Sequence, residues 1–75
     1  MAKLPSLTAR KVVHALKRVG FVEDRHRGSH LILLHPGTRA RTVVPIHSGR
    51  TIKEPLLRAI LRDAGLTIDE FLSLV

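Results

Sequence analysis

The chain has 75 residues, 44% of them apolar, and its 13 Lys and Arg against 6 Asp and Glu give a net charge of +7. This length allows one domain over residues 1–75, the absence of cysteine excludes disulfides and thiolate metal sites, and no apolar run approaches the roughly 18 residues that span a bilayer. The basic surplus favours a polyanionic partner over mere solubility or an acidic protein partner, and without a signal-peptide pattern we predict a cytoplasmic protein.

The first periodic stretch predicts a helix over residues 6–19. Its apolar residues recur near helical spacing, and basic residues take the other side. Ser6 or Thr8 can serve as the N-cap, and Gly20 stands where a helix-ending glycine is expected.

Three short strands are predicted next, near residues 21–27, 29–35 and 41–47. The second contains a run of four apolar residues bounded by turn signals, and the third is rich in β-branched residues. Arg27-Gly28 is expected to form the first turn, and Pro45 indicates an edge strand or a strand end.

The C-terminal third predicts two helices. The stronger pattern runs over Pro55–Ala64 and ends at Gly65. Thr67 and Glu70 have the spacing of a capping box, which predicts a short last helix over Ile68–Leu74.

This order of elements, α-β-β-β-α plus a short helix, predicts an α+β two-layer sandwich. Short connections make the three strands an antiparallel sheet, and the two main helices must cover its apolar face. We expect one core that contains Leu16, Phe21, Ile60, Leu61 and Phe71.

Five short motifs keep their order across nearly the whole chain: Gly20-Phe21, Arg27-Gly28-Ser29-His30, Val44-Pro45-Ile46-His47, Ala64-Gly65-Leu66 and Glu70-Phe71-Leu72. This ordered set resembles the HicA (YcfA-like) toxin family. The resemblance implies a fold like that of double-stranded-RNA-binding domains, cleavage of mRNA without a cofactor, and neutralisation by a HicB-like antitoxin. It also implies that the histidine of the Gly-Ser-His motif, here His30, is catalytic.

The chain departs from the family pattern at one place. Many members carry Gly-Thr at the start of the second long helix, where this chain has Pro55-Leu56. If that Gly-Thr helps to hold phosphate, this chain binds RNA differently there.

The chemistry of His30 supports catalysis independently. RNA carries its own nucleophile, the 2′-OH, so an enzyme must only move protons and neutralise the phosphorane, tasks that suit histidine and arginine. If Arg27-Gly28 is a two-residue loop, His26 pairs with Ser29, and Arg25 lies opposite His30. The alternative is a strand histidine packed under an apolar neighbour.

Six further residues are predicted to contact RNA or phosphate: Arg25, Arg27, Ser29, His47, Arg50 and Lys53. His47 also ends a strand, so it is either a second catalytic group or a loop histidine. We expect His26 and His35 at the surface and His14 beside the apolar stripe of the first helix.

Other functions are weaker candidates. The spacing His26-x-x-x-His30 would suit a metal on a helix, but a glycine turn interrupts it, so we predict neither a metal nor a cofactor. With two Phe as the only aromatics, base stacking is not expected. A non-catalytic RNA-binding module of the same fold remains the main alternative. A DNA-binding domain using Leu56–Ala64 is disfavoured by the three intervening strands.

Overall fold

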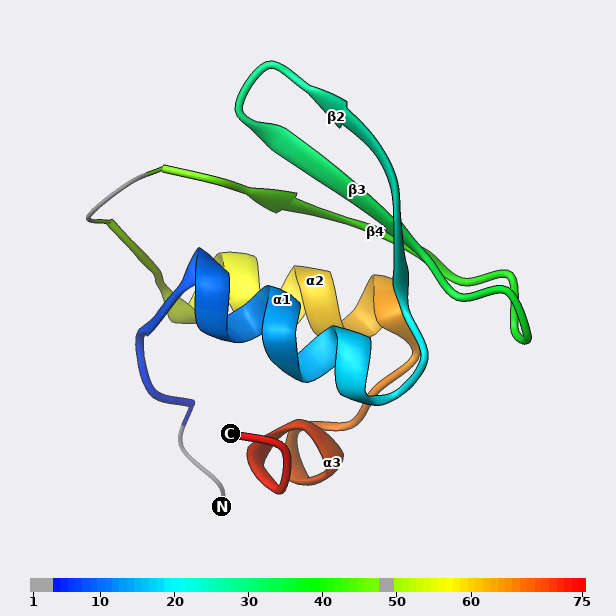
Figure 1. Cartoon of the computed structure of the whole chain (residues 1–75). Helices are drawn as coiled ribbons and strands as arrows, with labels where there is room; N and C mark the ends of the chain where they lie inside the picture. Colours follow the sequence, from blue (N-terminus) through cyan, green and yellow to red (C-terminus); the bar gives the residue numbers. More distant parts are fainter. Residues whose placement is uncertain (1–3, 48–49) are drawn as a thin grey trace.

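Two helices lie side by side on one face of a three-stranded antiparallel sheet (Figure 1). The computed structural model describes residues 4–47 and 50–75. Its elements are β1 (Leu7–Thr8), α1 (Ala9–Arg18), β2 (Val22–Arg27), β3 (His30–Leu34), β4 (Arg41–Pro45), β5 (Thr51–Ile52), α2 (Glu54–Ala64) and α3 (Ile68–Leu72). The predicted α+β sandwich is confirmed. In the described part of the chain, no helix has the length and apolarity to cross a membrane.

The start of α1 differs from the prediction. Leu7 pairs with Ile52 and Thr8 with Thr51, in a small two-stranded sheet of β1 and β5. The helix therefore begins after Thr8, whose hydroxyl oxygen accepts a hydrogen bond from the Lys11 amide at 3.3 Å. A strand of two residues is too short to show any period, which is why the sequence pattern did not reveal it.

The sheet, in the order β2-β3-β4, turns alternate residues toward the helices. Leu31 and Leu33 of β3 are 5% and 0% exposed, and their partners in β4, Val44 and Thr42, are buried with them. The Thr42 hydroxyl donates to the Ile60 carbonyl of α2 at 3.0 Å. This bond satisfies a buried polar group and ties α2 to β4.

The predicted core is confirmed. All five residues expected in it are at most 3% exposed: Leu16, Phe21, Ile60, Leu61 and Phe71. Leu16 lies in α1, Phe21 in the segment after α1, Ile60 and Leu61 in α2, and Phe71 in α3. The core therefore joins segments that are far apart in the sequence.

The ends of α2 and α3 follow the predicted signals. Gly65 ends α2 in the left-handed conformation, with φ of 76°. The Thr67 hydroxyl accepts from the Glu70 amide at 3.1 Å, and the Glu70 carboxylate accepts from the Thr67 amide at 2.8 Å, which completes the capping box. The bond from the Thr67 amide lowers the pKa of Glu70 below its ordinary value. The helix ends at Leu72, two residues before the predicted end.

We expected His35 at the surface, but it is half-buried and holds three backbone groups by hydrogen bonds. Its Nε2 donates to the Val19 carbonyl at 2.9 Å, and its Nδ1 accepts from the amides of Gly37 and Thr38 at 3.0 and 3.1 Å. These partners are consistent only with the neutral tautomer that carries its proton on Nε2. One ring thus ties the end of α1 to the turn between β3 and β4.

Two neighbours fit the His35 ring closely. The ring of Phe21 meets it edge-on, with centroids 5.2 Å apart. Gly20 has φ of 105°, and a Cβ there would lie 2.7 Å from His35 Nε2. Glycine is therefore required at position 20 both by the backbone conformation and by the space that the imidazole occupies.

Replacing His35 by alanine should lower the free energy of unfolding by about 1–2 kcal/mol, because three backbone groups lose their partner. His14→Ala is the control, since His14 is exposed on α1; it should change stability by no more than roughly 0.5 kcal/mol. Urea unfolding of both variants measures the difference. If the two variants were equally stable, the prediction would be wrong, because water would then satisfy the three backbone groups as well as the imidazole does.

Acid should loosen α3 before it unfolds the rest of the chain. The pKa of Glu70 is lowered from 4.5, so its stabilising effect is present above pH 4.5 and is lost as the pH falls through the lower value of the folded state. Amide exchange across α3, followed by NMR from neutral pH to about pH 3, measures this. Glu70→Gln keeps an acceptor but does not titrate, so it should abolish the selective response of α3.

Candidate functional site

The turn between β2 and β3 sets the surroundings of His30, and our predicted register for it is wrong. The two turn residues are Gly28 and Ser29, and Arg27 pairs with His30. Arg25 lies opposite Ile32 instead. The positive φ that this tight turn needs falls on Gly28, at 57°, whereas the predicted turn would have started with an arginine.

His30 lies on the face of the sheet that the helices leave open. It is exposed, whereas the next residue, Leu31, is buried beneath the helices. On this outer face His30 has Arg27 on one side and Pro45 on the other, as its partners in β2 and β4. Directly opposite residues have Cβ atoms about 4.5–5.5 Å apart, so a guanidinium is within reach of the imidazole. The alternative of a packed strand histidine is excluded.

Arg25 also lies on the outer face, two positions before Arg27 in β2. Its partner Ile32 stands between Leu31 and Leu33, which point inward, so Ile32 and Arg25 point outward. The register shifts between Glu23 and Arg25, so Asp24 forms a bulge there. The Asp24 carboxylate lies 3.7 Å from the guanidinium of Arg41. Arg25 and Arg27 form no ion pair within the described residues, which leaves their charge available beside His30.

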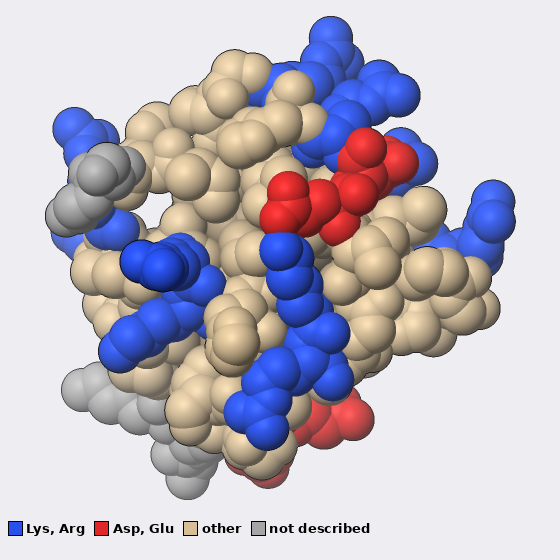
Figure 2. Space-filling view, in the orientation of Figure 1, with Lys and Arg blue, Asp and Glu red and all other residues tan. Residues whose placement is uncertain are grey.

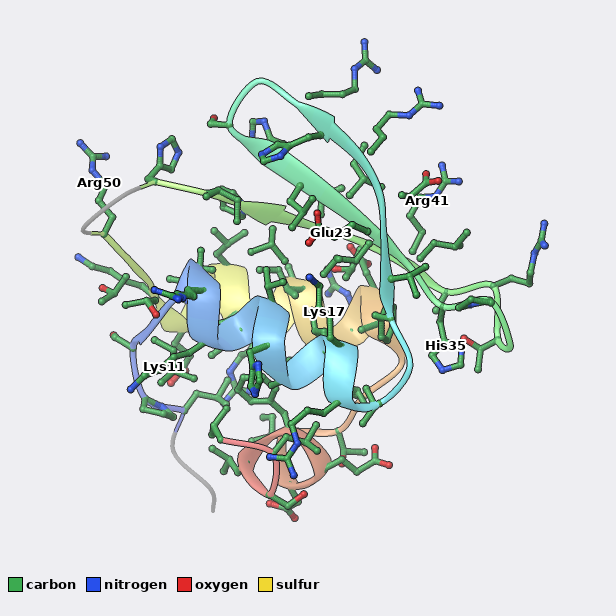
Figure 3. All side chains as sticks on the ribbon, in the orientation of Figure 1. Lys11, Lys17, Glu23, His35, Arg41 and Arg50 are labelled. Atoms are coloured by element: carbon green, nitrogen blue, oxygen red, sulfur yellow. The ribbon has the colours of Figure 1, made fainter. Side chains whose placement is uncertain are left out.

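His47, Arg50 and Lys53 follow β4 on the way to α2. All three are exposed, and the Arg50 amide donates to the His47 carbonyl at 3.2 Å. The Ile46 amide donates to the Ser29 carbonyl at 2.6 Å. This bond continues the pairing of β3 with β4 beyond the end of β4, as far as the turn beside His30. Figure 3 shows Arg50 at the end of the sheet opposite His35. Ser48 and Gly49 lie outside the described residues.

The structure therefore brings together Arg27, Ser29 and His30 on one turn, with Arg25 on the same face. Among the described residues, no side-chain hydrogen bond joins His30 to Arg50 or Lys53. Lys53 is the N-cap residue of α2 and makes no side-chain capping bond there. In residues 4–47 and 50–75, no three His, Asp or Glu side chains gather as metal ligands would.

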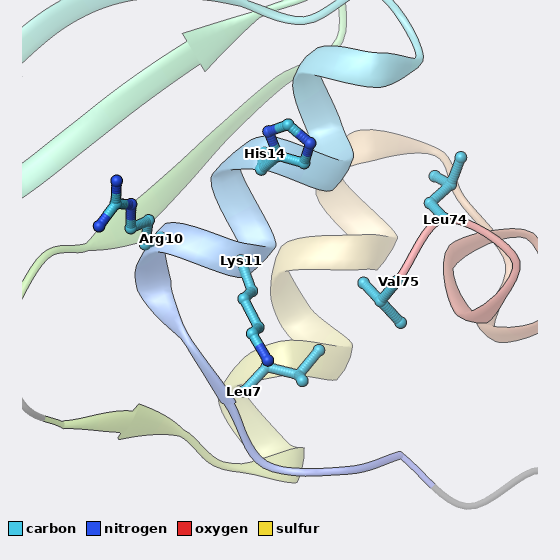
Figure 4. Close-up of a pocket in the computed structure, with 6 residues that line it drawn as sticks. All are labelled: Leu7, Arg10, Lys11, His14, Leu74 and Val75. Carbon is cyan, nitrogen blue, oxygen red and sulfur yellow. The ribbon is translucent and has the colours of Figure 1, made fainter.

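The described residues form two hollows on the α1 side of the molecule, and His30 lines neither of them. One, of about 550 Å³, lies between α1 and the last residues of the chain, lined by Leu7, Arg10, Lys11, His14, Leu74 and Val75 (Figure 4). The other, of about 480 Å³, lies between α1 and the β2–β3 hairpin. We call the second one the hairpin groove.

The hairpin groove has an apolar floor and charged walls. Val13, Leu31 and Ile46 supply the apolar part, and Arg10, His14, Lys17, Glu23 and His26 supply the polar part. Lys17 pairs with Glu23, as Figure 3 shows. The hydrogen bond and the charge of Lys17 hold the pKa of Glu23 below its ordinary value of 4.5, and His26 lowers it further.

Basic side chains dominate the surface over α1 and around the β2–β3 hairpin. Figure 2 shows Lys and Arg across the face that α1 presents and around the hairpin, with an acidic patch near the middle of the view and further acidic atoms at its lower edge. Our predicted site residues include none on α1, although the basic side of this helix was recognised in the sequence. The signal was present, since α1 carries five basic residues, counting His14, and no acidic one: its sequence is ARKVVHALKR.

Comparison with known protein families agrees with the motifs in the sequence. A family profile for the HicA toxin of bacterial toxin–antitoxin systems matches residues 9–66, from the first residue of α1 to just beyond α2. A search of curated proteins found no match. The matched stretch covers well over half of the chain and includes the hairpin that carries His30. The chain therefore belongs to the HicA family of bacterial toxins.

Proposed function

We propose that this toxin is a metal-independent endoribonuclease that cleaves mRNA in the cytoplasm, with His30 as its catalytic residue. One observation carries the proposal: in a member of the HicA family, the histidine of the Gly-Ser-His motif is exposed on an open sheet face, directly opposite Arg27. An open face suits a long substrate, because a polynucleotide cannot enter a closed pocket.

The proposed reaction uses the substrate's own hydroxyl. A general base takes the proton of the ribose 2′-OH, and the oxygen attacks the adjacent phosphorus. The bond from phosphorus to the 5′ oxygen breaks, and a general acid protonates that oxygen. The products are a 2′,3′-cyclic phosphate and a 5′-hydroxyl end. His30 carries one of the two proton transfers, since imidazole exchanges protons near neutral pH.

The neighbouring cations would serve the phosphate. Negative charge builds on the phosphorane oxygens during attack, and a guanidinium offers a planar fork of donors to such oxygens. Arg27 is the nearest candidate because it faces His30 across the strand pair, and Arg25 continues the same row. Ser29, in the turn, can donate from its hydroxyl. Arg50 and Lys53 would hold phosphates further along the RNA.

His47 is our candidate for the second proton transfer. Ile46 lines the hairpin groove on the helix side, so alternation along the chain assigns His47 to the outer face. Pro45 is the partner of His30, and a residue two positions from a direct partner is a diagonal neighbour on the same face, about 7–8 Å away. A substrate phosphate between the two rings would bridge this separation.

The proposed partner is a HicB-like antitoxin that covers the outer face. This face exposes apolar side chains, with Val22 47% and Val43 40% exposed, next to Arg25 and Arg27. A surface that combines apolar contacts with a basic rim suits an acidic, partly apolar protein surface. An antitoxin seated there would block RNA from His30.

The main alternative is a non-catalytic RNA-binding module. The basic surface alone would support binding, and nothing about charge requires cleavage. The two functions differ in one observable: only the enzyme loses an activity when His30 is replaced.

Replacing His30 by alanine or by glutamine should lower the cleavage rate about a hundredfold to ten-thousandfold, because neither residue can relay a proton. Binding of RNA should be nearly unchanged, since phosphate contacts are spread over many arginines. Purified proteins are compared on a short RNA, with thermal melts to confirm folding. Wild-type cleavage should persist in EDTA and fail on a substrate with 2′-deoxyribose at the cleavage site.

Two results would redirect the proposal. Equal cleavage by wild type and His30→Ala would remove His30 from the mechanism and move the assignment to His47. Binding without cleavage by the wild-type protein would favour the non-catalytic module.

The double variant Arg25→Ala/Arg27→Ala should associate with the antitoxin more slowly than wild type, and the difference should shrink as salt is added. Stopped-flow association rates at low and high salt measure this. Arg62→Ala is the control, because Arg62 is exposed near the end of α2 and outside the outer face. An equal effect of Arg62→Ala would indicate a response to net charge, and would contradict docking on the outer face.

A further inference from the structure

The hairpin groove lies on the opposite side of the sheet from His30. Figure 1 shows the β2–β3 hairpin rising away from α1. The groove between them has an apolar floor formed by Val13, Leu31 and Ile46. Its volume of about 480 Å³ falls within the range of about 300–1,000 Å³ that is typical of small-molecule sites.

Basic groups from two elements face this floor. Arg10 and His14 come from α1, one turn apart, and His26 comes from β2. The carboxylate of Glu23 is paired with Lys17. Arg10 has no ion-pair partner in the described part of the chain. The groove thus combines an apolar surface with unneutralised positive charge at its walls.

We propose that the hairpin groove binds one nucleotide of single-stranded RNA, next to the segment held at His30. The base and ribose lie on Val13, Leu31 and Ile46, and the phosphate is held by Arg10, His14 and His26. This proposal rests on the proposed function in taking RNA as the substrate, and it adds a second contact site on the helix side of the sheet.

The alternation of β2 provides a route for RNA between the two sites. Arg25 and Arg27 face outward, and His26, whose partner is the buried Leu31, faces the groove. Strand β2 is an edge strand, and all six of its residues are exposed. A polynucleotide that crosses this edge therefore meets a basic side chain on each face in turn.

The groove fits a nucleotide better than the hollow near Val75 does. That hollow lies between α1 and the last residues of the chain, and it does not reach the hairpin that carries His30 (Figure 4). The two hollows share Arg10 and His14 but not Lys11, which lines only the hollow near Val75. This difference supplies a matched pair of variants.

The experiment measures binding of a fluorescent single-stranded oligoribonucleotide, with every protein carrying His30→Ala so that the RNA stays intact. Arg10→Ala should weaken binding roughly tenfold, because a charge-assisted contact with phosphate is lost. It should also reduce the slope of log affinity against log salt by about 0.7, the value for one phosphate contact on a single strand. Lys11→Ala, in the same turn of α1, should change both quantities much less.

A second measurement locates the nucleotide directly. Adenosine 5′-monophosphate is titrated into the methyl-labelled protein and followed by NMR. Methyl signals of Val13, Leu31 and Ile46 should shift, and His26→Ala should weaken the response. Shifts confined to Ile32 and Val43 on the outer face, or no shift at all, would overturn the proposal.

Two further outcomes would also overturn it. Equal losses in Arg10→Ala and Lys11→Ala would mean that α1 attracts RNA by net charge alone. A loss of antitoxin affinity in Arg10→Ala with RNA affinity unchanged would make the groove a protein-docking surface. Because binding is measured without cleavage, a wild-type protein that fails to cleave RNA would refute the proposed nuclease and leave this result standing.

Discussion

The placement of His30 and of the arginines beside it depends on the burial of Leu31 and Leu33 beneath the helices. These two side chains fix which face of β3 meets α1 and α2. Since alternate residues of a strand point to opposite faces, their burial puts His30 on the open face. A slip of one residue would bury the imidazole and expose the leucines, so the core and the site are set by one register.

The same alternation divides the hairpin into two surfaces with different properties. The outer surface has His30, Arg27 and exposed apolar residues, and the helices do not cover it. The inner surface is concave where His26 faces α1. The two histidines are four positions apart in sequence, but they lie on opposite faces of the sheet, so they cannot act on one phosphate. A partner of His30 in proton transfer must therefore come from the outer side.

Most of the fold could be predicted because its signals are local. Helical spacing, glycines at helix ends and the capping box at Thr67 each act within a few residues, and each was found where the sequence indicated. Two features could not be predicted in this way. The β1–β5 pairing joins residues that are about 45 positions apart in the sequence, and each strand has two residues, too few to show a periodic pattern. The role of His35 depends on Val19, which only folding brings near.

The candidate site was predicted less completely than the fold. The motif identified His30 and its arginines, but the arginine opposite His30 depended on which two residues form the turn. Both choices contain Gly28, and the pairing of Arg27 with His30 shows that the loop is Gly28-Ser29. The groove was missed because Arg10 and His26 lie 16 positions apart and no spacing rule connects them.

The bulge at Asp24 has a consequence for how the protein behaves in a crowded cell. An edge strand with free backbone groups is a template on which a second chain can add a strand, and repeated addition leads to aggregates. The bulge interrupts the regular spacing of β2, and charged side chains on either side of it disfavour close approach by an identical edge. The hairpin can therefore remain uncovered for the proposed RNA substrate or antitoxin without recruiting further copies of itself.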